Sequence, residues 1–167
     1  MVTTAAILAE LRTARDGFLA ALDDVDPALL GAPGLVGQWS ARELIAHLGY
    51  WSGHAAEALH RAELGTLHEF GSDDPAFDVD EVNETVARVA RDTDLATVRL
   101  REEAAYGALV ERLAAAEDAW LLDTTGYRDT LEQVLREDGP DHYREHTFDL
   151  RSWFAGDPEP DEDDDDD

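Results

Sequence analysis

The 167-residue chain contains no cysteine and carries a net charge of -26, from 39 acidic residues against 13 basic ones, all of them arginine. Without cysteine, a disulfide framework, a zinc–thiolate site and a cysteine nucleophile are excluded, so a metal site would need histidine or carboxylate ligands. The acidic balance argues against binding of nucleic acid or an anionic membrane, because such binding depends on Lys and Arg.

The first half of the chain predicts two helices. Apolar side chains recur every three or four positions over residues 4–22, and the proline and glycine residues of segment 26–34 then predict a loop. The second helix has a clear start, since Ser40 is placed to cap it and Glu43 follows three residues later. Residues 66–79 form a connection long enough to cross one end of a helical bundle.

The second half of the chain predicts two further helical regions. Residues 80–117 are helical with a break at positions 92–94, where Asp94 is placed to cap a new helix. The last region covers residues 129–154 and pauses at positions 138–140, because proline suits a first helical turn better than a helix interior.

These elements predict the fold class. Four main amphipathic helices, with no alternating strand pattern, favour an all-α fold, an antiparallel four-helix bundle over residues 1–155. Residues 156–167 are mostly Asp and Glu and have little to bury, so they predict an acidic disordered tail.

The candidate functional residues are histidines. His142 and His146 stand at i and i+4, so both rings leave one face of the last helix. That face continues through Leu150 and Trp153, which indicates that it is buried. His47 lies on the inward stripe of the second helix. Three such imidazoles could hold a zinc, nickel or ferrous ion and leave positions for water or substrate, although three packing histidines remain an open alternative.

The other polar and aromatic residues have simpler interpretations. His54 follows His47 by seven residues and is interpreted as a packing or partly exposed residue, with a place in the same interior as His47 as the alternative. His60 and His68 are interpreted as surface residues. Packing is the first interpretation for three aromatic residues, with a wall of a substrate pocket as the alternative: Tyr50, Trp51 and Tyr143. Asn83 is interpreted as a residue that caps a helix or forms a surface hydrogen bond. A solvated helix face is the first interpretation for three carboxylates, with a hydrogen bond to a metal-binding imidazole as the alternative: Asp141, Glu145 and Asp149.

Four segments carry a resemblance to a known family. They are residues 38–48 (QWSARELIAHL), 82–84 (VNE), 142–146 (HYREH) and 149–153 (DLRSW). Together they resemble the DinB-like (YfiT-like) superfamily over nearly all of the chain up to residue 154. This resemblance implies a four-helix bundle, often a homodimer, with His47, His142 and His146 as metal ligands. The family pattern also gives an alternative for Asn83, which would reach toward the site.

The resemblance also implies a function. Several relatives are metal-dependent transferases that use mycothiol or bacillithiol, and others are maleylpyruvate isomerases or colibactin self-protection proteins. We therefore expect a protein that binds one divalent metal ion, Zn, Ni or Fe. With this ion it would transfer a low-molecular-weight thiol to a small electrophile. The nucleophile would be a metal-bound thiol or water, and no protein side chain is assigned as catalytic. The alternatives are a metal-dependent hydrolase or isomerase, and a non-catalytic protein that sequesters a reactive metabolite.

The location and partners follow from composition. No run approaches the roughly 20 apolar residues that a membrane-spanning helix needs. The first ten residues lack the basic start and long apolar core of a secretory signal. We expect a cytoplasmic protein with a small-molecule substrate, and without nucleic acid or membrane partners.

Overall fold

The computed structural model describes residues 1–71 and 78–155 of the chain. The described part contains no β-strand, only two isolated β-bridges, which confirms the predicted all-α fold. Its helices are α1 (Thr4–Asp23), α2 (Ala41–Glu63), α3 (Val79–Arg91), α4 (Leu95–Ala115), α5 (Leu131–Arg136) and α6 (His142–Ala155). Shorter turns are η1 (Pro27–Leu29), η2 (Leu67–Glu69), η3 (Asp118–Leu122) and the π-helical turn η4 (Glu137–Asp141). The predicted acidic tail and the middle of the predicted loop 66–79 lie outside the described residues.

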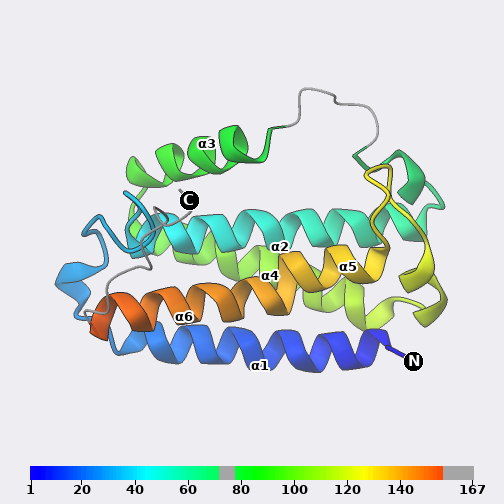
Figure 1. Cartoon of the computed structure of the whole chain (residues 1–167), viewed down its shortest axis with the longest axis horizontal. Coiled ribbons are helices and arrows are strands. Elements are labelled where there is room, and N and C mark those ends of the chain that lie inside the picture. Colours follow the sequence, from blue (N-terminus) through cyan, green and yellow to red (C-terminus); the bar gives the residue numbers. More distant parts are fainter. Residues whose placement is uncertain (72–77, 156–167) are drawn as a thin grey trace, which may run out of the picture.

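Four long rods form the bundle: α1, α2, α4 and the continuous run of α5, η4 and α6 (Figure 1). α1 is antiparallel to α2, and α4 is antiparallel to α6. α2 and α4 run in the same direction, because the connection that contains α3 crosses back along the bundle. Two contacts between α2 and α4 show that these helices are parallel. Gly49 packs against Glu102 in the first half of both helices, and Arg112 contacts His60 near their ends.

The local signals at the start of α2 act as predicted. The backbone N–H of Ser40 donates to Glu43 Oε2 at 2.6 Å, which is one arm of the capping box. The inward stripe of this helix, which includes Leu44, His47 and Leu48, is buried. After Glu63 the chain leaves the helix, and Gly65 adopts a φ of 73°, a conformation that favours glycine.

The predicted break before α4 is also confirmed. Asp94 caps α4 by accepting a hydrogen bond from the backbone N–H of Thr97 at 2.9 Å. α3 does not join the four rods but lies against α2 (Figure 1). Its buried residues are small, Ala87 and Ala90, and Arg91 forms an ion pair with the buried Glu43 of α2. Each helix in the described residues is too short or too polar to cross a bilayer.

A buried ionic network, which we name the glutamate cluster, joins all four rods. It consists of Arg15, Ser52, Glu102 and Tyr143. Arg15 of α1 donates to both carboxylate oxygens of Glu102 of α4, at 2.9 and 2.8 Å. The hydroxyl of Tyr143 of α6 donates to Glu102 Oε1 at 2.5 Å and lies 3.3 Å from Ser52 Oγ of α2. Because each charge has a partner, this cluster can fix the helix register without leaving a buried ion unpaired.

Candidate metal centre

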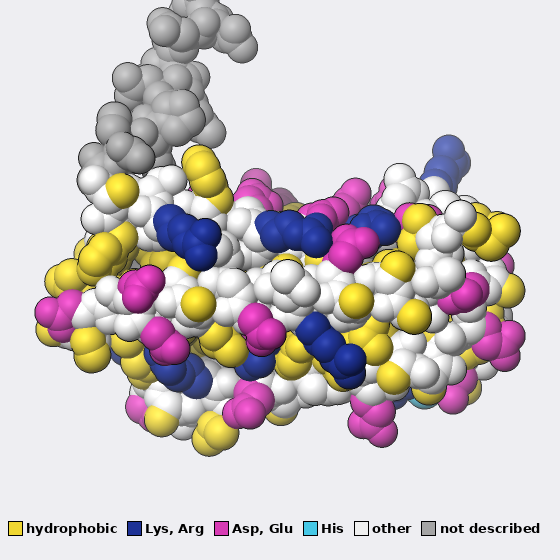
Figure 2. Space-filling view, turned by 90° about the horizontal axis from the view of Figure 1, so that it is seen from below, with side chains coloured by type: hydrophobic (Ala, Val, Ile, Leu, Met, Phe, Trp, Pro, Cys, Tyr) yellow, Lys and Arg dark blue, Asp and Glu magenta, His cyan; other side chains and the backbone are white. Residues whose placement is uncertain are grey.

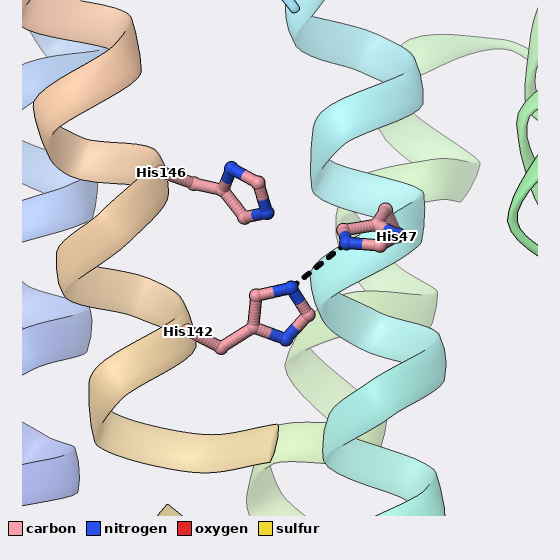
Figure 3. A group of neighbouring side chains, drawn as sticks. All are labelled: His47, His142 and His146. Atoms are coloured by element: carbon pink, nitrogen blue, oxygen red, sulfur yellow. Dashed lines mark hydrogen bonds between the residues drawn. The ribbon is translucent and has the colours of Figure 1, made fainter. Parts of the chain in front are cut away.

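The structure brings together the three histidines that the sequence singled out (Figure 3). We name them the histidine cluster: His47 of α2, and His142 and His146 of α6. The Nε2 atoms of His47 and His142 lie 2.8 Å apart, and one ring nitrogen from each of the three lies within 4.8 Å of the others. His47 and His146 are each 6 % exposed, whereas His142 is half-buried.

The unpaired nitrogens of this cluster distinguish it from ordinary packing. His47 Nδ1, His142 Nδ1 and His146 Nε2 are buried and have no hydrogen-bond partner among the described residues. A buried ring nitrogen without a partner costs about 1–3 kcal/mol. The donor set, neutral nitrogens converging from two helices, suits zinc, nickel or ferrous iron. The residues therefore fit a divalent cation.

Burial also keeps the rings of His47 and His142 neutral. Desolvation and then the neighbouring His146 lower the pKa of His47 to about 3. Desolvation, followed by the proximity of His47 and His146, lowers the pKa of His142 to about 2. A metal ligand must be a neutral imidazole, because a protonated ring has no lone pair to donate. Both rings are thus in the ligand form at neutral pH and well below it.

Asp149 orients the third ring. Its Oδ2 lies 2.8 Å from His146 Nδ1, one turn further along α6. An ionised carboxylate can only accept, so Nδ1 carries the hydrogen and the lone pair is on Nε2, the unpaired nitrogen. Carboxylates commonly hold metal-binding histidines in this way. From the sequence this contact is only an alternative for Asp149, although the i, i+3 spacing from His146 on one helix indicates it.

Two tryptophans flank His47. The ring centroid of Trp39 lies 5.0 Å from that of His47, and the centroid of Trp51 lies 6.4 Å from His47 and 6.5 Å from His142. The Trp51 indole N–H donates to Asn83 Oδ1 of α3 at 2.9 Å. α3 thereby fixes one aromatic wall of the site.

The remaining sequence candidates lie elsewhere. Tyr143 belongs to the glutamate cluster and faces away from the three histidines. Side chains of His60 and His68 are 38 % and 73 % exposed, as expected for surface residues. His54 is largely buried and forms a 2.6 Å contact with Asp138, a pairing that the sequence analysis missed because the two residues are far apart in the chain.

A separate apolar pocket of about 340 Å³ lies between α2, α3 and α4. Its walls include Ala46, Tyr50, Val86, Ala90 and Val98. None of the three histidines is among its lining residues. The pocket is therefore distinct from the histidine cluster.

Comparison with known proteins identifies the family. Residues 10–154 match the DinB superfamily, and the chain belongs to it. No protein of curated function matches the sequence.

Solved structures with the same fold have low sequence identity. An uncharacterised protein from Escherichia coli UTI89 is 13 % identical with a TM-score of 0.74, and the match covers 92 % of this chain and 94 % of that one. The mycothiol-dependent maleylpyruvate isomerase is 22 % identical with a TM-score of 0.70, covering 90 % of this chain but only 63 % of the isomerase. The colibactin self-resistance protein ClbS, solved with double-stranded DNA, is 15 % identical with a TM-score of 0.70, covering 90 % and 94 %. At these identities the likeness shows the shared fold.

Proposed function

We propose that the protein is a metal-dependent enzyme that transfers a low-molecular-weight thiol to a small electrophile. His47, His142 and His146 would hold one divalent ion, Zn, Ni or Fe. The observation that carries the proposal is the convergence of three imidazoles from two helices, with buried ring nitrogens that have no hydrogen-bond partner among the described residues. Such an ion would lower the pKa of a bound thiol or water and so supply a nucleophile near neutral pH.

The residues around the cluster define what can enter. His142 is the least buried of the three histidines, so co-substrate and substrate would approach beside it. The indoles of Trp39 and Trp51 exclude water beside His47 and favour an apolar or aromatic electrophile. The thiol must come from solution, because the chain contains no cysteine.

The family supports a thiol as co-substrate. One protein of the same fold is named as mycothiol-dependent, so mycothiol is the first thiol to test and bacillithiol the second. This chain spans only 63 % of that isomerase, so the maleylpyruvate reaction itself is not carried over. The substrate class is therefore proposed from the walls of the site and not from the relative.

Turnover of a thiol with an aromatic electrophile tests the proposal. The protein loaded with Zn, Ni or Fe is expected to accelerate the addition, and both the chelator-treated protein and His47→Ala are expected to lose this acceleration. Product that forms at an equal rate in metal-free protein would overturn it. Metal-dependent product without any thiol would instead identify a hydrolase or isomerase. Capture of one electrophile per chain without turnover would identify a sequestering protein.

We also propose that the protein does not bind DNA at physiological salt, although ClbS was solved with it. The chain carries 39 acids against 13 arginines. On the face seen in Figure 2, arginines are interspersed with Asp and Glu and form no continuous basic stripe. Phosphate binding needs such clustering. A gel shift at micromolar protein and about 150 mM salt would contradict this.

A further inference from the structure

The π-helical turn η4 sets the direction of α6. In this turn Gly139 leaves helical geometry, with φ of -110° and ψ of -110°, and Pro140 provides no backbone N–H. A π-turn inserts about one extra residue into a helix, and each residue of an α-helix turns the chain by about 100°. His142 is the first residue of α6 after η4. The conformation of η4 therefore decides whether His142 faces His47.

One side-chain contact joins this turn to α2. Asp138 Oδ2 of η4 lies 2.6 Å from His54 Nδ1 of α2, and the two side chains are only 14 % and 18 % exposed. Burial raises the pKa of Asp138, and the hydrogen bond from His54 opposes this shift. The contact thus favours the ionised carboxylate in a position where desolvation alone would disfavour it.

The pair spans the same two segments as the metal ligands. His54 lies two helical turns after His47 on α2, and Asp138 lies four residues before His142. The ring of His54 is itself held by aromatic neighbours, with its centroid 5.0 Å from that of Trp51 and 4.7 Å from that of Phe70. Trp51 also contacts His47 and His142, so the pair and the histidine cluster share one packed wall.

We propose that His54 and Asp138 are positioning residues for the metal centre. By joining η4 to α2, their contact holds His142 at the distance from His47 that one cation requires. This inference rests on the proposed metal function, and it assigns a role to two residues that do not touch the cation. A contact that only stabilised the fold would leave the affinity of the folded protein for metal unchanged.

A Co²⁺ titration of the full chain tests this role. Asp138→Ala and His54→Leu are expected to weaken Co²⁺ binding about tenfold and to shift the visible absorption of the Co²⁺ complex, as for other residues that orient metal-binding histidines. Glu137→Ala removes a charge from the same turn at an exposed position and is expected to match the wild type. His54→Asn keeps a donor near the place of Nδ1 and is expected to restore most of the affinity.

The outcomes separate the inference from the proposed function. Equal Co²⁺ affinity and absorption in Asp138→Ala and Glu137→Ala, both measured on folded protein, would overturn the positioning role. A wild-type protein that does not bind Co²⁺, Zn²⁺, Ni²⁺ or Fe²⁺ would overturn the proposed function. In that case the imidazole NMR signals of His142 still report on its position. These signals should shift in Asp138→Ala and stay in place in Glu137→Ala. Signals that stay in place in Asp138→Ala would contradict the positioning role.

Discussion

The glutamate cluster and the histidine cluster both contain residues of α2 and α6, and Tyr143 of the first follows His142 of the second directly in the chain. The two clusters nevertheless differ in how their buried polar atoms are paired. In the glutamate cluster, Glu102 accepts from both Arg15 and Tyr143, so each buried charge has a partner. In the histidine cluster, only His146 contacts a carboxylate, and ring nitrogens remain unpaired within the described residues.

This difference separates a structural network from a binding site. The hydrogen bond with Glu102 raises the pKa of Arg15, and burial raises the pKa of Tyr143, so both keep their protons. The network needs no ligand. Buried ring nitrogens without a partner are unfavourable by themselves, and a cation bound at His146 Nε2 would remove part of that cost. The histidine cluster thus lowers the local stability of the metal-free bundle, whereas the glutamate cluster stabilises the helix register.

The largest expected effect comes from breaking the glutamate cluster. Glu102→Ala leaves Arg15 without its carboxylate and Tyr143 without its acceptor, and should lower the free energy of unfolding by about 3–5 kcal/mol. Urea denaturation monitored by circular dichroism measures this. Glu103→Ala, an exposed neighbour on the same helix, is the matched control. A loss below about 1 kcal/mol would show that Arg15 finds another partner.

His47→Leu should hardly change the stability of the metal-free protein but should abolish its stabilisation by zinc. An apolar side chain of similar size removes an unpaired ring nitrogen, so the metal-free variant should unfold within about 1 kcal/mol of the wild type. Zinc at about 100 times its Kd should stabilise the wild type by about 2.7 kcal/mol and leave the variant unchanged. Thermal melts with zinc and with chelator make the comparison. An equal zinc-dependent shift in the variant would remove His47 from the ligand set.

Asp149→Ala should weaken metal binding and leave the stability of the fold nearly unchanged. Without the carboxylate, the His146 ring loses its fixed orientation, and metal affinity should fall by about 10–100-fold. The side chain of Asp149 is 30 % exposed, so the fold should lose little. Isothermal titration calorimetry with zinc is the measurement, with Glu145→Ala as control on the exposed side of the helix. Matching affinities in the two variants would contradict an orienting role.

Acid should destabilise the metal-free protein through the histidine cluster. The pKa of His47 is lowered to about 3 in the folded protein, against about 6.5 unfolded. Below pH 6.5 the unfolded chain therefore binds a proton that the folded protein excludes. The stability that His47 contributes is complete above pH 6.5 and falls by up to about 1.4 kcal/mol per pH unit toward pH 3. With chelator present, the urea midpoint of the wild type should fall more steeply between pH 7 and pH 5 than that of His47→Leu. Equal slopes would show that His47 is accessible to protons.

The amino-acid sequence alone determined the elements that depend on local signals. The capping arrangement of Ser40 and Glu43 marks the start of α2, and Asp94 marks that of α4, because caps act within one turn. The i, i+4 spacing placed His142 and His146 on one face for the same reason. The resemblance then named the family, and the match over residues 10–154 confirms it.

Only the tertiary structure decided which distant residues meet. The 2.8 Å approach of His47 to His142 depends on how far η4 rotates α6, and sequence periodicity cannot predict that rotation. The same holds for the pairing of Asp138 with His54 and of Glu102 with Arg15 and Tyr143. Glu102 stands four residues after Val98 on the buried face of α4, so its spacing fits burial, but its charged and hydroxyl partners come from α1 and α6. Contacts between rods depend on their relative rotation and register, which packing of the whole core sets.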